Sequence, residues 1–480
     1  MAVLATRCSG AVNGVSRLHG EVSRRIFQPL YPRWPRGEIP VTYVTNGVHV
    51  PSWDSSAADT LWTNACGKDR WLSTMETIVE DFSQVSDESL WRLRVEKTAG
   101  LLSYVRECFA GQLLSARASS ELVNQCAQFL DPNVLTIGFA RRFTGYKRPN
   151  LLLRDPDRLD KILNDRRRPV QLIIAGKAHP RDEEGKALVG EWWKYSGRPE
   201  VRGRVVFLSD YDMALAEHLV QGVDLWINTP RRPWEACGTS GMKVLVNGGL
   251  NLSELDGWWS EAYEPGVGWA IGDGQEHDEP SWDETEAEQL YRVLEEEVVP
   301  CFYDRDDKGI PRAWVASMRS SMSELTPQFS ANRMVREYVD GLYSPSLNAY
   351  RRRIANNCQE AVLVCRWRES LAQHWHKLRF GNLTTDRIDE SYLVKVTVYI
   401  DDLDPAAVQV QLYAETADAG GPEINVMQLT GTVEGAVNGY VYSATVPVRR
   451  QVRDYTPRII PHFDGCAVPM EANNILWFQP

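Results

Sequence analysis

Nine residues, EACGTSGMK from Glu235 to Lys243, combine a loop that can hold a phosphate with a lysine that can bind a cofactor. The small residues Gly238 to Gly241 precede a helical pattern, MKVLVNG, where free N–H groups and the helix dipole favour a phosphate. Lys243 can pair with that phosphate as a point charge, or its amine can bind pyridoxal phosphate covalently. Small-residue turns before helices are also common as simple caps, so the motif by itself leaves these interpretations open.

A second polar segment, ARRFTGYKRPN, gathers four cations at Arg141, Arg142, Lys147 and Arg148. Cations this close repel one another unless anions meet them. The segment is therefore either a solvated basic loop or a phosphate site. Its predicted place at the same edge of a sheet as the GTSG loop favours phosphate binding.

The pattern between residues 134 and 255 predicts the sheet that positions both segments. Apolar runs alternate with helical or capped segments, which is typical of a parallel sheet covered by helices. The strand-like runs are VLTIGFA, VQLIIAGK, RVVFLSD and DLWINTP, and the segments after them are PNLLLRDPDRLDKIL, DEEGKALVGEWWKYS, MALAEHLVQG and MKVLVNG. Ligands of a doubly wound α/β sheet bind beyond the carboxyl ends of its strands. The segments ARRFTGYKR, KAHPRDE, SDYD and TPRRPWEACGTSG lie at those ends.

Other patterns flank this α/β region. Residues 1 to about 60 are rich in loops, with a short strand and turns in VTYVTNGVHVPSW, and a capping box, SDES, opens a helical region from Ser86. Residues 281 to about 380 are mostly helical and predict a brace for the sheet. After Asp389 the period becomes two, with a turn signal at Asn438 and Gly439, which predicts a C-terminal β-sandwich of about 95 residues.

Composition limits the function classes. The chain has 480 residues, of which 43% are hydrophobic and 24% charged, and these fractions are typical of globular proteins. Its net charge of −11 argues against a nucleic-acid binder. No run of about 18 apolar residues could cross a membrane, and the first residues lack a signal-peptide pattern, so we expect a cytoplasmic protein without a membrane partner. Nine scattered cysteines, and a His374–His376 pair on different helix faces, predict no metal site.

Four segments in this order and spacing resemble the C-terminal catalytic lobe of the α-glucan (glycogen, starch or maltodextrin) phosphorylases, in their bacterial and archaeal branch. They are RRFTGYKRPNLLLRDPDRL, LIIAGKAHP, VVFLSDYDMALAEHL and EACGTSGMKVLVNGGLNLSELDGW. VNGVSRLHGEVSR and TNGVHVPSW resemble family segments that precede this lobe, and the resemblance covers about residues 8 to 345.

The resemblance implies the C-terminal lobe of a two-lobe GT-B glycosyltransferase architecture. The expected parts are the tail of an N-terminal lobe with a helical linker in residues 1–130, a pyridoxal-phosphate-binding α/β lobe in 131–280, helical bracing in 281–383 and a β-sandwich domain in 384–480.

The resemblance also implies a reaction: phosphorolysis of terminal α-1,4-linked glucose to α-D-glucose 1-phosphate, with pyridoxal 5'-phosphate as cofactor. Lys243 would bind the cofactor covalently. The phosphate of the cofactor would contact Gly238, Thr239, Ser240 and Arg141, and its ring would contact Tyr211. The substrate phosphate would bind to Arg142 and Lys147. The glucosyl unit would lie against Glu235, Cys237 and Tyr146. Two phosphates about 4 Å apart repel by about 4 kcal/mol per pair of unit charges at an effective dielectric of about 20, so these cations are needed. A phosphate titrates near neutral pH and can pass the proton that the departing sugar oxygen takes up.

The length departs from the family pattern. Family members have a large N-terminal lobe, and Met1 falls within the segment that ends it, so we expect a chain that is inactive alone or that joins a separately encoded N-terminal half. A homo-oligomer is equally open. Two other functions compete: a nucleotide-sugar-dependent glycosyltransferase resembling glycogen synthase, which Lys243 after GTSGM disfavours, and a non-catalytic glucan-binding subunit.

Overall fold

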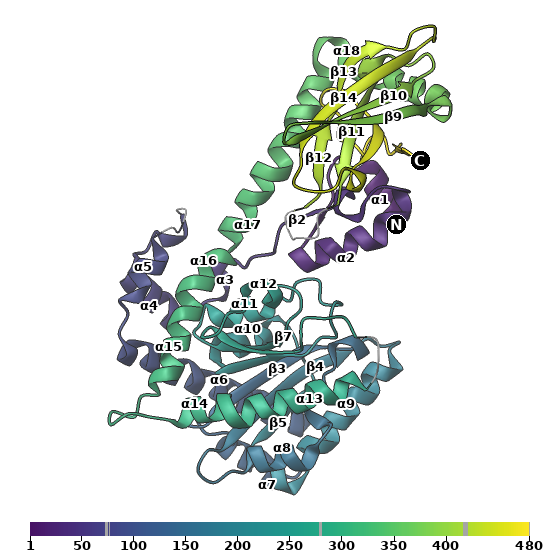
Figure 1. The fold of residues 1–480 in the computed structure, drawn as a ribbon. Helices are drawn as coiled ribbons and strands as arrows, with labels where there is room; N and C mark the ends of the chain where they lie inside the picture. The colour runs from purple at the N-terminus through teal and green to yellow at the C-terminus, as the bar shows by residue number, and fades with distance from the viewer. Residues whose placement is uncertain (73–74, 76, 278–280, 416–420, 480) are drawn as a thin grey trace. The chain divides into compact units, whose positions relative to one another are not determined.

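The computed structural model describes residues 1–72, 75, 77–277, 281–415 and 421–479. It divides the chain into two compact units (Figure 1). We call the larger one, made of Gly14–Gly20 and Tyr43–Glu337, the α/β unit. We call the other, made of Met1–Asn13, Glu21–Thr42 and Tyr338–Pro480, the antiparallel unit.

A six-stranded sheet forms the centre of the α/β unit. Its strands are β3 (Leu135–Phe143), β4 (Val170–Ala178), β5 (Val205–Leu208), β6 (Leu225–Asn228), β7 (Leu250–Glu254) and β8 (Gly268–Ile271). They pair in the order β5-β4-β3-β6-β7-β8, and every pairing is parallel. The chain therefore winds from β3 outward in both directions. The sequence predicted β3 to β6 and this α/β class, and the structure confirms both.

Helices pack on both faces of this sheet. The helices of the α/β unit are α3 (Val50–Trp53), α4 (Ser56–Cys66), α5 (Ile78–Ser83), α6 (Asp87–Ser115), α7 (Ser120–Gln125), α8 (Pro156–Leu163), α9 (Glu183–Ser196), α10 (Met213–Gly222), α11 (Ser240–Leu245), α12 (Trp259–Ala262), α13 (Trp282–Val293), α14 (Val299–Tyr303), α15 (Arg312–Ser320), α16 (Thr326–Gln328) and most of α17 (Ala331–Tyr338). Helix α13 runs in front of the strands in Figure 1. Because successive residues of a strand point to opposite faces, Ile137 and Phe139 join one buried cluster with α8, α9 and α13, and Ala140 joins another with α6 and α10.

The antiparallel unit contains two four-stranded sheets. The strands are β9 (Arg379–Ile388), β10 (Ser391–Tyr399), β11 (Val408–Ala414), β12 (Glu423–Val426), β13 (Gln428–Thr432), β14 (Gly439–Pro447), β15 (Thr456–Pro461) and β16 (Leu476–Trp477). One sheet has the order β13-β14-β10-β9 and the other β12-β11-β15-β16. Val396 of the first and Leu412 of the second belong to one buried cluster. Asn438 has a φ of +55° at the predicted turn, and Gly439 is already the first residue of β14.

The remaining elements lie near the N-terminus and before β9. They are α1 (Ala2–Cys8), α2 (Arg17–Phe27), a short pair of β1 (Asn13–Gly14) and β2 (Thr42–Tyr43), and α18 (Ser344–His374). Helix α18 leaves helical geometry from Ala355 to Cys358, where three successive residues have positive φ. The sequence did not predict α2 within its loop-rich start, because the segment has few apolar residues and an internal Gly20.

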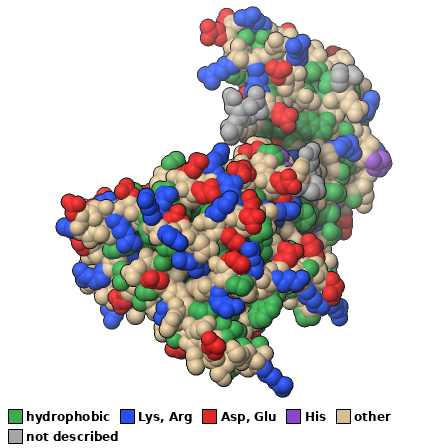
Figure 2. All heavy atoms as spheres, turned by 90° about the horizontal axis from the view of Figure 1, so that it is seen from below, with side chains coloured by type: hydrophobic (Ala, Val, Ile, Leu, Met, Phe, Trp, Pro, Cys, Tyr) green, Lys and Arg blue, Asp and Glu red, His purple; other side chains and the backbone are tan. Residues whose placement is uncertain are grey.

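The surface is mixed in charge. Lysine and arginine side chains alternate with acidic ones over the face shown in Figure 2. Among the described residues, no helix combines the length and the apolar character needed to cross a membrane.

A buried ion pair fixes α6 against the amino end of β6. Arg94 donates through Nε and Nη2 to the Asp224 carboxylate at 2.8 and 2.7 Å, and both residues are about 1% exposed. The backbone N–H of Thr136, in β3, donates to the same carboxylate at 2.9 Å. The pair therefore links one covering helix to the two central strands.

Replacing Asp224 by alanine should destabilise the α/β unit by about 3–5 kcal/mol, because it leaves a buried guanidinium without its counter-charge. Urea unfolding of the full chain measures this loss. The matched control is Glu88→Gln, which breaks the exposed Glu88–Lys308 pair and should have a much smaller effect. Equal losses for the two variants would contradict the role of the Arg94–Asp224 pair.

Candidate functional site

Strand β3 places its two arginines in different surroundings. Arg141 is buried, whereas the next residue, Arg142, lies on the opposite face of the strand and is exposed. Among the described residues, no ion pair or hydrogen bond of the Arg142 guanidinium is found. The two arginines are therefore not equivalent.

A single carboxylate, that of Glu235, gathers two of the cations. Its Oε2 lies 2.6 Å from Nη2 of Arg141 and 2.8 Å from Nζ of Lys147. Burial raises the pKa of Glu235, but the two neighbouring cations outweigh it and lower the pKa below its ordinary value. Glu235 is therefore an anion at neutral pH. Nη1 of Arg141 is buried and has no hydrogen-bond partner among the described residues.

Arg148, the fourth cation of the cluster, has a structural role. Its φ of +44° ends the turn after β3, and it donates to the carbonyls of Thr229 and Pro230. Its guanidinium also pairs with three buried acids, Glu254, Asp283 and Glu286. These contacts fix the turn that carries Lys147 to the loop after β6, and they leave Arg148 unable to reach a ligand.

Lys243 is the fourth residue of α11 and lies against an aromatic ring. Its Nζ is 3.4 Å from the centroid of Trp53, and burial lowers the pKa of this amine. Asn247 holds the two together, because its Nδ2 donates to the carbonyls of Trp53 and Lys243 at 2.9 and 3.0 Å. No carboxylate pairs with Lys243 in the part of the chain that the structure describes.

The loop before α11 approaches its neighbours closely. Gly238 has a φ of +86°, and a Cβ there would lie 3.3 Å from Cγ of Glu235. Thr239 and Ser240 follow at the start of α11, where the first N–H groups of a helix lack an intrahelical acceptor. Cys237 is buried, and burial raises the pKa of its thiol to about 12, so it lines the loop as a neutral group.

Two tyrosines border the group formed by Arg141, Lys147 and Glu235. Tyr211 follows β5 and is partly buried; burial raises its pKa, and the charge of Arg141 opposes that rise. Tyr146 lies beneath the Lys147 ammonium, whose Nζ is 4.8 Å from its ring centroid. The structure thus joins Arg141, Lys147, Glu235 and Tyr146, and it places Lys243 on the segment that follows at the same sheet edge.

The carboxylate of Asp256 accepts hydrogen bonds from the backbone of the Glu235 loop. Its Oδ2 accepts from the N–H of Glu235 at 2.9 Å, and its Oδ1 accepts from the N–H of Gly257 at 2.8 Å. Burial raises the pKa of Asp256 to about 7, although these two hydrogen bonds lower it. This carboxyl therefore titrates near neutral pH beside the site.

Sequence reasoning left two contributors without a role. Trp53 and Asn247 touch Lys243, and both lie in segments that carry the family resemblance, TNGVHVPSW and MKVLVNG. The resemblance of these two segments to the family was the one indication in the sequence that Trp53 and Asn247 could belong to the site. The distance of 194 positions between Trp53 and Asn247 hides their contact in the sequence.

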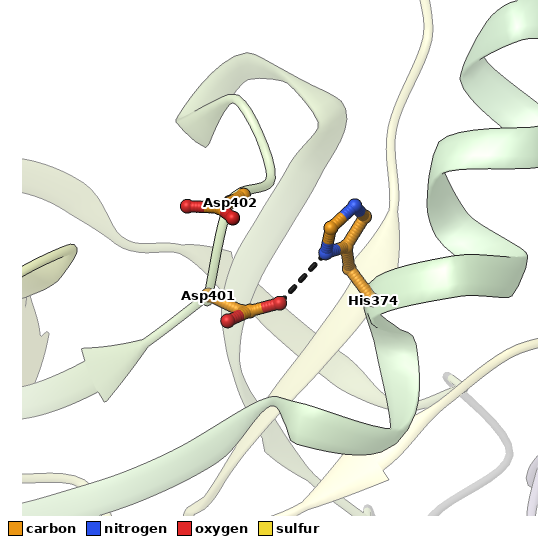
Figure 3. Close-up of side chains that lie close together, drawn as sticks. All are labelled: His374, Asp401 and Asp402. Carbon is orange, nitrogen blue, oxygen red and sulfur yellow. Dashed lines mark hydrogen bonds and ion pairs between the residues drawn. The ribbon is translucent and has the colours of Figure 1, made fainter.

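Metal-ligating side chains meet in the antiparallel unit. His374 and Asp401 point toward each other, with Nδ1 and Oδ2 2.6 Å apart, and Asp402 is their neighbour (Figure 3). The ammonium of Lys377 lies 2.9 Å from the same Asp401 oxygen. The Asp401 carboxylate is therefore already shared by a lysine cation.

Comparisons with known proteins cover both units. Residues 1–264 match the family model of carbohydrate phosphorylases, and residues 375–479 match that of the glycogen phosphorylase C-terminal domain. A glycogen phosphorylase of Mycobacterium tuberculosis is 39% identical over 484 residues, which cover 98% of this chain and 56% of the relative. One of Aquifex aeolicus is 41% identical over 346 residues, 72% of this chain and 49% of the relative. A maltodextrin phosphorylase of Thermococcus litoralis is 36% identical over 415 residues, which cover 86% of this chain and 48% of the relative. The chain spans about half the length of these relatives.

The pKa of Asp256 predicts a pH dependence of stability. It rises from 3.8 to about 7 on folding, so Asp256 favours the folded state fully below pH 3.8, and this contribution is lost as the pH rises toward 7. The loss is at most about 4 kcal/mol, at about 1.4 kcal/mol per pKa unit. Relative to Asp256→Asn, the wild type should lose unfolding free energy between pH 4 and pH 8. Urea unfolding measures both proteins, and parallel pH curves would contradict the raised pKa.

Proposed function

Because the chain belongs to the carbohydrate phosphorylase family, we propose that it acts as an α-1,4-glucan phosphorylase. The reaction would transfer the terminal glucosyl unit of a glycogen, starch or maltodextrin chain to inorganic phosphate, releasing α-D-glucose 1-phosphate. The observation that supports the proposal is the excess of cations at the carboxyl edge of the parallel sheet. Glu235 pairs with Arg141 and Lys147 there, whereas Arg142 and Lys243 have no carboxylate partner among the described residues. Such a site suits substrates and cofactors that carry phosphate.

The residues present fit pyridoxal 5'-phosphate. The lowered pKa of Lys243 favours the neutral amine, which is the form that reacts with a carbonyl. The buried Nη1 of Arg141 has no partner among the described residues and can donate to a phosphate oxygen. We propose that Lys243, Arg141, Tyr211 and the backbone of Gly238, Thr239 and Ser240 hold the cofactor. When bound, the cofactor's phosphate supplies a group that gives and takes a proton near neutral pH.

The other site residues would bind and orient the substrates. Arg142, which has no ion pair with any described residue, would receive the substrate phosphate, and Lys147, in the turn after β3, would bind it as well. Glu235, held as an anion, can accept hydrogen bonds from the hydroxyls of the glucosyl unit, with Cys237 and Tyr146 beside it. Paired with both cations, the Glu235 carboxylate also limits their repulsion before phosphate arrives.

We extend the proposal to the architecture. Residues 131–280 of the α/β unit would be the pyridoxal-phosphate-binding C-terminal lobe of a GT-B glycosyltransferase. Of the helical bracing expected in 281–383, residues 281–337 belong to the same unit, and the rest belong to the antiparallel unit. The two antiparallel sheets, which share one buried cluster, support a β-sandwich in residues 384–480.

Binding of pyridoxal phosphate should depend on Lys243. We expect the 480-residue chain, mixed with the cofactor and freed of excess, to absorb at about 330 nm or about 410 nm, where enzyme-bound pyridoxal absorbs. Lys243→Ala and Lys243→Arg should both lose this band, because neither offers a neutral amine.

The matched control is Lys186→Ala, which removes an exposed lysine of α9 and should keep the absorbance band. Release of glucose 1-phosphate from maltodextrin and phosphate then tests the reaction itself. A band that survives in Lys243→Ala would contradict the cofactor assignment. A chain that keeps the band but releases no product would contradict the proposed activity and favour a glucan-binding role.

The two arginines of β3 should affect different ligands: Arg142 the substrate phosphate and Arg141 the cofactor. Arg142→Gln should raise the KM for phosphate about tenfold or more, as the loss of a charge-assisted hydrogen bond does, and leave the pyridoxal band unchanged. Arg141→Gln should instead weaken cofactor binding, measured by titration of the same band. Similar behaviour of the two variants in both measurements would contradict the division of roles.

A further inference from the structure

Trp234 presents an exposed aromatic ring at the edge of the site. Its side chain is 67% exposed. All seventeen tryptophans are described, and Trp193, at 46%, is the one other that is exposed. Exposed apolar residues are ordinary when they are scattered, so exposure alone assigns no role.

The backbone around Trp234 is fixed by hydrogen bonds on both sides. Its own N–H donates to the carbonyl of Arg231 at 2.9 Å, and the N–H of Arg231 donates to the carbonyl of Tyr146 at 2.6 Å. On the other side, the N–H of Glu235 donates to Asp256. The ring is therefore held out from an ordered loop.

A second aromatic ring lies beside it. The ring centroids of Trp234 and Tyr146 are 6.4 Å apart, with their planes tilted by 38°. Tyr146 carries the Lys147 ammonium over its ring, and Trp234 directly precedes Glu235 in the chain. Two aromatic side chains thus border the carboxylate and the ammonium that meet at Glu235.

This combination matches the chemistry of a sugar. A pyranose ring has an apolar face of C–H groups, which stacks on an aromatic ring, and an edge of hydroxyls, which hydrogen-bonds to charged groups. We propose that Trp234, together with Tyr146, forms an aromatic platform that binds a pyranose ring of the glucan next to the glucosyl unit at Glu235. The inference rests on the proposed function for the identity of the sugar chain, and it adds Trp234 as a determinant of glucan affinity.

Calorimetric titration of the full chain with maltoheptaose tests the platform. Trp234→Ala should weaken binding about five- to tenfold, since aromatic stacking contributes up to about 1.5 kcal/mol and tenfold corresponds to about 1.4 kcal/mol. Trp234→Phe should restore part of the affinity, and Trp234→Leu, apolar but without a flat face, should not. Trp193→Ala, on α9, is the matched control and should bind as the wild type does.

The same preparations keep this inference separate from the proposed function. The pyridoxal band of Trp234→Ala shows that its site is folded, and the KM for maltoheptaose should rise while the KM for phosphate stays unchanged. If the wild type binds maltoheptaose or releases glucose 1-phosphate, and Trp234→Ala binds equally well, the platform alone is refuted. Full affinity in Trp234→Leu would likewise replace stacking by generic apolar contact. A wild type that neither binds maltoheptaose nor releases product overturns both.

Discussion

The pairing of two cations with one carboxylate is the constraint on which the candidate site depends. Arg141 and Lys147 both contact Oε2 of Glu235, and the buried Asp256, whose pKa burial raises to about 7, carries only part of a negative charge at neutral pH. The edge of the sheet therefore keeps a positive surplus. A protein can hold such a surplus at low cost only where anions complete it. Contacts around the site, such as those of Arg148 with three buried acids, hold the backbone beside these charges in place.

Much of the fold follows from local patterns in the sequence. The capping box SDES predicted the start of α6, where the Ser86 side chain accepts from the N–H of Ser89. The apolar runs predicted β3 to β6 because their residues are buried on both faces. Strand β7 was missed because Asn251, Ser253 and Glu254 are buried although they are polar, and an apolar pattern cannot reveal them. The sequence shows residue type, whereas their burial depends on partners elsewhere in the chain.

Part of the candidate site could likewise be predicted from the sequence, and part could not. Its position at the carboxyl edge of the sheet could be predicted, because that edge is set by the order of strands and loops. The contact of Glu235 with Arg141 and Lys147 could not, since these residues lie 94 and 88 positions apart and the pairing depends on the path of the loop after β6. The separation of Arg148 from the other cations was equally hidden. The residue before it, Lys147, is also a cation, and its acidic partners Asp283 and Glu286 belong to α13.

The cysteines have a practical consequence. Cys237 lines the Glu235 loop, but its thiol is buried and its pKa is about 12, so very little reactive thiolate is present there at neutral pH. Cys358 and Cys365 of α18 are exposed, and Cys358 lies within the break of that helix. Mild alkylating reagents will therefore modify α18 before the site loop. Fluorophores or spin labels can be attached at this break, to report on the helix without modifying Cys237 of the Glu235 loop.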